Sequence, residues 1–579
     1  MSDVRDYSQN AKLGPEDPGW SSWVQAPLII ESPDTAKWDE EADVVVVGFG
    51  GAGACAAIEA AERGADVIAL DRFAGGGATK LSGGVYYGGG TDVQKDAGIE
   101  DSSENMYAYL QRQIQGAVSD ETLHRFCEES NPSFEWLKSH GVKYSGPAYA
   151  HKANYPPQGF YLYYSGNERL SGFREHAKPA ARGHRAVHPD GGAGMTGFAY
   201  FGALERAALH AGVRVINHAP VTRLVIDRQG DVQGVEARIM PADTGARARH
   251  EALLAKWKPL NPLHANRRRR VQKKLELLEA REGVCRRIRA RNGVVLSSGG
   301  FIHNWEMLKS QAKVDHNRTV RLGSPGCDGS GIRLGQSVGG SVALMDHCDH
   351  SRGIRPDVFT LGMLINPQGE RFVNEQAYTG TIGDAVVKAG YKRLWLVVDK
   401  ELRNRAIGSS LPGRTAGGFF FLGLPVLLSL AFSTKRARTI EGLARKLNVD
   451  PATLRATLGS YNRCARGEAI DPFGKDPAAM KSLAKGPFYA IDQSIDSRFA
   501  PILAFTTGGL VVDEATGAVK REDGTPIRGL FAAGRTAVGI CSISYVSGLS
   551  IADCVFSGRR AARSMSPDRT HNQHAKSSD

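Results

Sequence analysis

The sequence contains no cysteine pair at CxxC spacing and no cysteine–histidine cluster with the spacing of a zinc site. Its eight cysteines are scattered, so we expect buried free thiols, a reducing cytoplasm and no metal site. The chain also lacks an apolar run of the ~20 residues that a membrane-spanning helix needs, and its polar start, MSDVRDYSQN, does not resemble a signal peptide. These absences argue against a secreted disulfide-bonded protein and against a multi-span membrane protein.

Excess positive charge is confined to one segment. The formal net charge is +12, but residues 247–291 hold 15 Lys and Arg against 4 Asp and Glu, so the remainder of the chain is almost neutral. A local basic docking surface therefore explains the charge better than the global basic field of a DNA-binding protein. We expect no nucleic-acid partner.

Glycine is abundant: 68 of the 579 residues, where ~7% is usual. The glycines cluster in short runs without a collagen period, a pattern that suits backbone segments that turn tightly or approach a large cofactor. The length and mass of the chain (62.3 kDa) predict two or three domains rather than one simple core.

A βαβ unit is predicted over residues 42–71, where a buried-type strand, a glycine turn, a helix and a second strand follow one another. The turn Gly48-Phe49-Gly50-Gly51-Ala52-Gly53 fits G-x-G-x-x-G. Its glycines permit the turn, the approach of a pyrophosphate to the backbone and close helix–strand packing, and the helix N-terminus faces the phosphates. Asp71 closes the second strand, where a carboxylate can accept hydrogen bonds from ribose hydroxyls. These features together predict a dinucleotide site.

Three further glycine-rich segments favour FAD over NAD as the dinucleotide. The loop from Gly75 to Gly84 offers small residues and two hydroxyls just beyond the second strand. SSGG at 297–300 and GLFAAGR at 529–535 are two more places where backbone can press on a cofactor. A flavin needs such additional backbone contact along its ribityl chain and ring.

Sequence motifs typical of nucleotide binding therefore occur near both ends of the chain, and the segment between them has a different pattern. The predicted fold class is α/β, with a discontinuous Rossmann-like FAD-binding domain and an inserted α+β catalytic domain. The predicted divisions are an N-terminal arm (1–40), a first FAD-binding part (41–303) with a basic amphipathic insertion (about 246–291), a catalytic or capping domain (304–499) with an apolar insertion (about 415–438), a second FAD-binding part (500–565) and a disordered tail (566–579).

Four segments together resemble the fumarate reductase/succinate dehydrogenase flavoprotein superfamily: DVVVVGFGGAGACAAIEAAERGADVIALDR, ATKLSGG, RFVNEQAY, and GLFAAGR with YVSGLSIADCVFSGRRAA. Within it the chain looks most like the bacterial FAD-dependent 3-ketosteroid dehydrogenases, over most of residues 41–565. Δ1-dehydrogenases typically carry a Tyr-Pro-Gly-Pro-Gly stretch near the end. The stretch Ser544-Tyr545-Val546-Ser547-Gly548 instead resembles the Δ4-(5α)-dehydrogenase branch.

This resemblance implies an enzyme that introduces a C4–C5 double bond into a 3-ketosteroid, by α-proton abstraction and hydride transfer to flavin N5. It implies an active site of Tyr378, Tyr545 and Ser547. Because tyrosine has a reference pKa near ~10, it becomes a base only with a neighbour that stabilises the phenolate or relays the proton. We predict Tyr378 as the base, Tyr545 as the group that polarises it and Ser547 as the group that passes the proton towards water. The order of the two tyrosines stays open.

The cofactor set follows from the same motifs, and the start of the final helix near Gly548 can stabilise the charge of the reduced flavin through the helix dipole. The residues predicted to hold FAD are Gly48, Gly50, Gly51, Ala52, Gly53, Asp71, Arg72, Thr79, Ser82, Gly83, Gly84, Val221, Gly299, Gly534, Arg535, Gly548, Leu549 and Ser550.

Other functions are considered alongside this one. A Δ1-dehydrogenase with an altered ending would differ in the position of the new double bond. A fumarate-reductase-like enzyme for a small unsaturated acid would need converging arginines and histidines for two carboxylates. A basic interaction protein that binds FAD without a catalytic role would show no loss of flavin absorbance when a steroid is added.

Two departures from the family pattern suggest membrane contact. In the basic segment, Val271, Leu275 and Leu278 share one helical face among arginines and lysines. The second departure is the apolar run 419–432, which is ~21 Å long as a helix and too short to span a bilayer. The apolar run can also be read as a buried core helix, and the basic run as a solvated face or a nucleic-acid patch. Their co-occurrence favours a peripheral enzyme on an anionic membrane surface, at the inner face of the cell membrane. An external electron acceptor is also required, and a quinone is one candidate.

Overall fold

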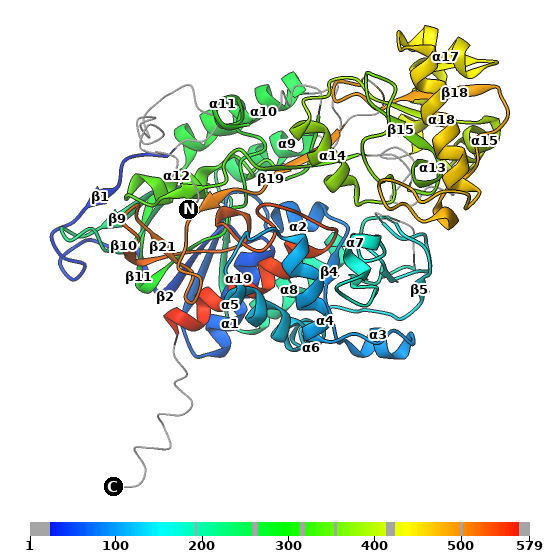
Figure 1. The fold of residues 1–579 in the computed structure, drawn as a ribbon. Helices are drawn as coiled ribbons and strands as arrows, with labels where there is room; N and C mark the ends of the chain where they lie inside the picture. Colours follow the sequence, from blue (N-terminus) through cyan, green and yellow to red (C-terminus); the bar gives the residue numbers. More distant parts are fainter. Residues whose placement is uncertain are drawn as a thin grey trace.

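The computed structural model describes residues 24–566, except 154, 192–193, 258–264, 313–318, 353–355, 413–422, 498 and 500–501. The fold is α/β. The described chain forms a large lobe around one mixed sheet and a second lobe, at the upper right of Figure 1, that carries most of the yellow helices. The predicted tail (566–579) and the first part of the N-terminal arm lie largely outside the described residues.

The large lobe contains a sheet in the order β1-β9-β10-β11-β2-β3-β8, with β22 joined to β11 and β21 joined to β22. Strands from the beginning and the end of the chain therefore lie in one sheet. The glycine-rich motifs near both ends of the sequence predict this arrangement. The strands are β1 (Leu28–Ile29), β2 (Glu40–Val47), β3 (Val67–Asp71), β8 (Arg214–Asn217), β9 (Val221–Ile226), β10 (Val232–Ile239), β11 (Val284–Leu296), β21 (Ala518–Lys520) and β22 (Pro526–Ala532).

The centre of this sheet is parallel and is buried on both faces. β2 pairs in parallel with β3 and β11, and β11 pairs in parallel with β22. Val44 and Val46 of β2 join the hydrophobic cluster under the helices α1 (Gly51–Glu62) and α19 (Leu549–Met565), whereas Val45 and Val47 join the cluster on the opposite face. Burial on both faces explains the uninterrupted valine run, which an amphipathic strand would not show.

The helices α1 and α19 cross each other closely. A Cβ at Gly558 would lie 2.4 Å from the backbone oxygen of Ala52, so this crossing requires glycine. Arg559 Nε donates to Glu59 Oε2 at 2.7 Å, and both side chains are almost fully buried. The crossing brings the N-terminal ends of both helices to the same region, on which the functional site depends.

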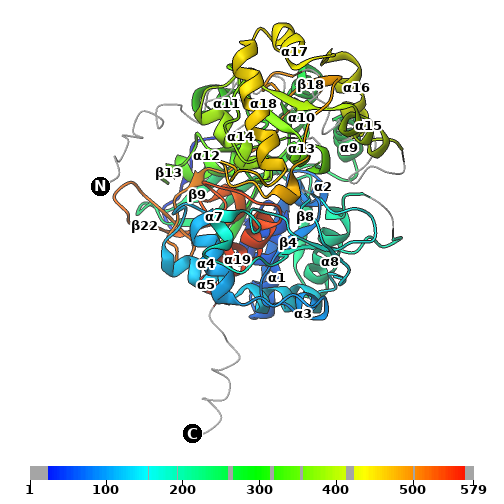
Figure 2. The ribbon, with the colours of Figure 1, turned by 45° about the vertical axis from the view of Figure 1, so that its right-hand side comes forward.

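The first part of the chain also supplies helices and a small sheet, β4-β7-β6-β5, beside the large sheet (Figure 2). Three of the helices, α4, α5 and α6, follow one another between residues 103 and 139. These elements are α2 (Gly77–Leu81), β4 (Val85–Tyr87), α3 (Asp92–Asp96), α4 (Ser103–Gln113), α5 (Asp120–Glu128), α6 (Ser130–Ser139), β5 (Ala148–Tyr149), β6 (Leu162–Tyr163), α7 (Ser171–Arg174), β7 (Gly183–Arg185) and α8 (Gly197–His210).

The second lobe is built on the antiparallel sheet β15-β16-β18-β17, which is covered by helices and has its own hydrophobic core. Its elements are α13 (Pro356–Leu361), β15 (Met363–Ile365), α14 (Thr379–Lys388), β16 (Trp395–Val398), α15 (Lys400–Ser409), α16 (Leu424–Phe432), β17 (Thr434–Ala437), α17 (Ile440–Leu447), α18 (Pro451–Ala465) and β18 (Phe488–Asp492).

Several short elements lie outside these sheets. A three-stranded sheet has the order β12-β19-β14, and β13 pairs with β20. The remaining elements are α11 (Trp305–Gln311), β12 (Val320–Arg321), α12 (Ser330–Ser337), β13 (Val342–Ala343), β14 (Cys348–Arg352), η5 (Pro477–Ala479), β19 (Ile502–Thr506), β20 (Gly509–Leu510) and η6 (Gly534–Thr536).

The basic insertion forms two helices, α9 (Ala246–Lys256) and α10 (Ala265–Glu282), between β10 and β11. Val271, Leu275 and Leu278 do share one face of α10, but that face is buried inside the protein. An amphipathic pattern indicates that one face of a helix is buried, but it does not identify the surface against which that face packs. In this structure the cover is the protein itself, so this apolar face is not the membrane-facing surface that we expected.

The apolar insertion is described only from residue 423 onward. Val426 and Leu430 of α16 belong to the core of the second lobe, while Phe432 is 72% exposed. Among the described residues, no helix has both the length and the hydropathy to cross a membrane.

Candidate active site

The glycine turn between β2 and α1 is shaped by close contacts. Gly48 has φ +98°, and a Cβ there would lie 2.7 Å from Ser298 Cα. A Cβ at Gly53 would lie 2.0 Å from the oxygen of Gly48, so this glycine permits the close packing of turn and helix. Gly50 and Gly51 instead line a cavity at the N-terminus of α1.

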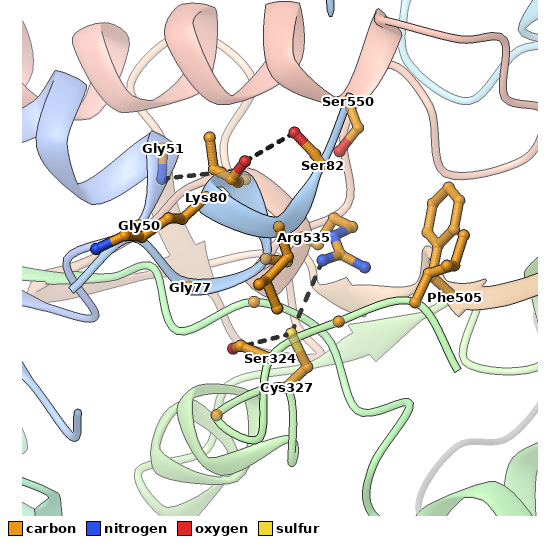
Figure 3. A pocket seen from close by; sticks show the side chains of 18 of the residues that line it. Gly50, Gly51, Gly77, Lys80, Ser82, Ser324, Cys327, Phe505, Arg535 and Ser550 are labelled. Carbon is orange, nitrogen blue, oxygen red and sulfur yellow. Dashed lines mark hydrogen bonds between the residues drawn. The ribbon is translucent and has the colours of Figure 1, made fainter. Parts of the chain in front are cut away.

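A second glycine turn, Gly75 to Gly77, leads into α2 and faces the first. The backbone N–H of Gly51 donates to Thr79 Oγ1 at 3.1 Å, which ties the two turns together (Figure 3). Ser82 Oγ donates to the oxygen of Thr79 and accepts from the N–H of Gly84. The hydroxyls of Thr79 and Ser82 thus hold the loop in shape at the cavity wall.

Asp71 ends β3 and organises the backbone around it. Its carboxylate accepts hydrogen bonds from the N–H of Phe49 at 2.9 Å and of Phe73 at 2.8 Å. Burial raises the pKa of Asp71, and these hydrogen bonds oppose the rise. Oδ1 also accepts from the N–H of Gly75 at 3.3 Å, whereas Oδ2 keeps a lone pair for a further donor, so the position still suits a ribose hydroxyl.

The C-terminal part of the chain completes the same cavity. Gly548, with φ +97°, begins α19, so that the N-terminus of this helix points at the cavity as α1 does. Arg535 comes from the turn after β22, lies 5.2 Å from the ring centre of Phe505 and contacts Cys327 Sγ at 3.8 Å (Figure 3). Two helix N-termini and a cation at one cavity favour an anionic ligand.

The cavity is about 670 Å³ in volume and extends from the glycine turns to the second lobe. Its wall includes most of the residues predicted to bind the cofactor: Gly48, Gly50, Gly51, Ala52, Asp71, Arg72, Thr79, Ser82, Gly83, Val221, Gly299, Gly534, Arg535, Gly548 and Ser550. Gly53, Gly84 and Leu549 do not line it. Gly53 and Gly84 meet neighbouring backbone closely, and Leu549 is fully buried in the core, so these three serve packing.

The three predicted catalytic side chains lie at the same cavity. Tyr378, just before α14, and Tyr545 have ring centres 5.9 Å apart in an edge-to-face arrangement. Phe505 packs edge-on against Tyr545 at 4.9 Å. Ser547 lines the cavity as well, and its Oγ lies 2.9 Å from the hydroxyl of the buried Tyr163.

Sequence reasoning missed several polar residues in this wall, among them Asp349 and Ser351 of β14. Ser351 Oγ donates to Asp349 Oδ2 at 2.6 Å, and both side chains are buried. Asp349 lies against α14, since a Cβ at Gly380 would be 2.1 Å from its Oδ1. No local motif surrounds these residues, and only the packing of β14 beside Tyr378 reveals them.

Burial governs the acid–base properties of this group. It raises the pKa of Tyr378 well above its ordinary value; Tyr545 and Asp349 add to the rise, and a hydrogen bond with Ser351 opposes it. The pKa of Tyr545 is likewise raised by burial. Burial, with the nearby charge of Asp384, raises the pKa of Asp349 to about 8. Both phenols are therefore neutral at rest, and a proton-accepting neighbour is needed for either to act as a base.

Comparisons with known proteins match this architecture. The family model of an FAD binding domain matches residues 43–548. The chain is 37% identical over 520 residues to a 3-oxo-5-alpha-steroid 4-dehydrogenase of Comamonas testosteroni, covering 88% of this chain and 95% of that one. The chain belongs to this family of FAD-binding flavoproteins.

Solved structures agree. A 3-ketosteroid-Δ4-(5α)-dehydrogenase of Rhodococcus jostii, in complex with 4-androstene-3,17-dione, has a TM-score of 0.76 and 30% identity, covering 93% of this chain and 99% of that one. A 3-ketosteroid Δ1-dehydrogenase of Sterolibacterium denitrificans has a TM-score of 0.64 at 20% identity over 92% of this chain and all of the other, and shares the fold.

The flavoprotein is therefore an FAD-dependent oxidoreductase, and the prediction of FAD is confirmed. The cavity fits this cofactor on physical grounds. Gly50 and Gly51 leave space for a pyrophosphate beside the backbone, and the N-termini of α1 and α19 direct the positive ends of their helix dipoles at its charge. The prediction of a family resemblance is also confirmed.

Proposed function

We propose that this flavoprotein dehydrogenates 3-ketosteroids and introduces a C4–C5 double bond. The observation that carries the proposal is the gathering of Tyr378, Tyr545 and Ser547 on the wall of the cavity that also contains the FAD-binding glycine turns. The 37% identity to a 3-oxo-5-alpha-steroid 4-dehydrogenase supports the same substrate and bond.

The reaction removes two hydrogens beside a ketone. The α hydrogen leaves as a proton, because the carbonyl delocalises the charge that remains, and a side chain must accept it. When bound, FAD supplies the acceptor for the β hydrogen, which leaves as a hydride. The protein also has to orient the apolar steroid, and Phe505 and Leu503 supply apolar wall beside the phenols.

We assign Tyr378 as the proton acceptor, with Tyr545 polarising it. The Ser351 hydroxyl is near enough to the Tyr378 phenol to lower its pKa, and it donates to Asp349. As Tyr378 takes the α proton, it can release its own proton to Ser351, and Ser351 can pass one to the Asp349 carboxylate. The first transfer breaks a C–H bond of the steroid and forms an O–H bond on Tyr378, and each of the two later transfers breaks one O–H bond and forms another, so the proton balance closes on the Asp349 carboxylate.

Ser547 takes a different role from the one we first predicted. Its hydroxyl pairs with Tyr163, which is fully buried, so its hydrogen bond leads into the protein rather than towards water. We therefore assign the exit of the proton to Ser351 and Asp349. Ser547, held by Tyr163, is left as a hydroxyl donor for the ketone oxygen.

Product analysis tests the activity. Purified enzyme is mixed with 5α-androstane-3,17-dione and an artificial electron acceptor, and the new double bond is located by mass spectrometry and NMR. We expect the C4–C5 alkene. A C1–C2 alkene would instead assign Δ1-dehydrogenation, and turnover of fumarate without turnover of steroid would assign a reductase of small unsaturated acids.

A tyrosine variant tests the assignment of the base. Because general acid–base catalysis contributes about 10²–10⁴-fold, we expect Tyr378→Phe to lower kcat by a factor in that range while FAD stays bound. Tyr107→Phe is the matched control, since its hydroxyl contacts Gln111 on α4 and does not line the cavity. Equal activity of both variants would contradict the assignment.

We also propose that the enzyme docks on an anionic membrane surface through the exposed side of α10, and passes its electrons to an external acceptor such as a quinone. Arg267, Arg270, Lys273 and Lys274 of this helix are exposed, whereas Val271, Leu275 and Leu278 are buried. Each such cation adds about 1 kcal/mol near an anionic surface. We expect co-sedimentation with vesicles that contain anionic lipid, release by salt, and no binding to neutral vesicles. A protein that ignores anionic vesicles at low salt lacks this docking.

A further inference from the structure

The helices α9 and α10 interrupt a β-hairpin that does not need them. β10 and β11 are antiparallel neighbours, and Ile239 lies directly opposite Val284. A two-residue turn can join two strands at such a register. Residues 240–283 stand between these strands in place of that turn. Their described part, 240–257 and 265–283, adds no strand to the sheet, so its contribution has to be sought elsewhere.

The buried side of the insertion contacts the wall of the cofactor cavity. Val271 and Leu275 of α10 form a small hydrophobic cluster with Trp257 and with Phe73, which follows β3. Trp257, Phe73 and Leu254 of α9 also line the cavity. The apolar contacts of the two helices are thus made against the same residues that enclose the cofactor space.

A buried ion pair fastens α10 at this place. Arg72 donates through Nε and Nη2 to the two carboxylate oxygens of Glu279, at 2.9 and 2.8 Å, and through Nη1 to Asp328 at 2.6 Å. His250 of α9 lies 2.9 Å from the same Glu279 carboxylate and stacks on the ring of Phe73. Such bidentate pairs fix geometry as well as energy.

The charge on this pair persists at physiological pH. Burial opposes the ionisation of Glu279, but the guanidinium of Arg72 and the hydrogen bond from His250 lower its pKa to about 2. Glu279 is only 4% exposed. Removing its charge would leave the buried Arg72 with Asp328 as its remaining carboxylate partner.

The position along the chain identifies the part of FAD that lies beneath these helices. Arg72 and Phe73 directly follow Asp71, the acid at the end of the second strand, where a βαβ nucleotide site holds the ribose of its adenosine. Ala219 and Val221 line the same end of the cavity, and the backbone N–H of Ala219 donates to the backbone carbonyl oxygen of Asp71. Tyr378 and Tyr545 belong to the catalytic end.

We propose that α9 and α10 form a cover over the adenosine end of the FAD site, fastened by Arg72 and Glu279, that slows the release of FAD. The cover excludes water from this end and has to open before the adenosine can leave. The proposal rests on FAD as the cofactor and is independent of which substrate is oxidised.

Removal of the cover is the direct test. Residues 240–283 are replaced by Asn-Gly, the two-residue turn that suits this register. FAD release is then followed as the rise in flavin fluorescence after dilution of the holoenzyme. We expect the dissociation rate to rise by about tenfold or more, because differences in affinity at one site appear mainly in that rate. A deletion variant with the circular dichroism of the parent and the parent's release rate would overturn the proposal.

A pair of single substitutions tests it without deleting residues. Glu279→Gln removes the charge opposite Arg72, whereas Glu282→Gln is on the same helix but pairs with Arg249 and Arg281. We expect several-fold faster FAD release from E279Q and the parental rate from E282Q. If the deletion variant does not fold, equal rates for E279Q and E282Q refute the cover. Failure of the steroid assay would leave both release experiments unaffected, so the two proposals are tested separately.

Discussion

The buried carboxyl of Asp349 gives the sharpest prediction, because it ties catalysis to pH. Its pKa is raised from 3.8 to about 8 by burial and by the nearby charge of Asp384, while Ser351 opposes the rise. If Asp349 receives the proton that Tyr378 releases through Ser351, it has to be ionised before turnover. We therefore expect the pH profile of kcat/KM to have an ascending limb with its midpoint near pH 8 and a plateau at higher pH.

Asp349→Asn is the decisive variant, since the amide keeps the shape of the carboxyl and can still accept from Ser351 but cannot take up a proton. We expect the limb near pH 8 to disappear and the plateau to fall by about 10²-fold or more. Lys152 lines the same cavity and burial lowers its pKa to about 7, so a new limb near pH 7 in D349N is assigned to that lysine, whereas a limb that stays near pH 8 is not.

Asp384→Asn is the matched control. Asp384 is partly exposed, and its charge is one of the causes of the high pKa of Asp349. Removing that charge lowers the pKa of Asp349, so the limb moves to lower pH while the plateau is kept. A D349N enzyme with the parental profile, or a D384N enzyme with an unmoved limb, would refute the reasoning.

The same ionisation also affects stability. The folded protein holds the proton of Asp349 up to about pH 8, whereas the unfolded chain releases it near pH 4, so stability falls as the pH rises between these values. At about 1.4 kcal/mol for each pH unit between the two pKa values, ionising Asp349 in the folded enzyme costs on the order of 5 kcal/mol. We expect D349N to lose less stability than the parent between pH 5 and 8 in urea denaturation.

Two further substitutions test the architecture. We expect Gly48→Ala to purify with little FAD, because the added Cβ would meet Ser298 and because φ +98° strains any residue with a side chain. Absorbance at 450 nm measures the FAD content, and a fully loaded G48A protein would contradict the reasoning. We expect Glu375→Gln to lower the free energy of unfolding by about 3–5 kcal/mol, because it leaves the buried Arg371 and Lys475 without this carboxylate. Denaturant titration measures the loss, and an unchanged midpoint would show that the charge of Glu375 contributes nothing to stability.

Local pattern explains which parts of the site could be read from the sequence. The glycine turn, the strand before it and Asp71 stand within 30 residues, and each type of residue there has a fixed geometric reason. Tyr378 and Tyr545 were predicted only through the resemblance of short motifs to a family. No periodicity or spacing links these two tyrosines, which are 167 positions apart in the sequence.

Residues that act through tertiary contact could not be read in this way. Asp349 and Ser351 stand on a five-residue strand without a motif, and only the approach of α14 brings them to Tyr378. The apolar face of α10 was visible as a pattern, but its partner, Phe73, lies about 200 positions earlier. A pattern that records burial does not name the surface that causes it.

The crossing of α1 with α19 has a consequence for how the holoenzyme is made. Glu59 and Arg559 meet across 500 positions of sequence, so one part of the wall of the cofactor cavity comes from the region of Gly50 and an adjacent part from the region of Gly548. A fragment that stops before residue 548 lacks the N-terminus of α19 at this cavity. We expect such a fragment to retain FAD more weakly than the full chain.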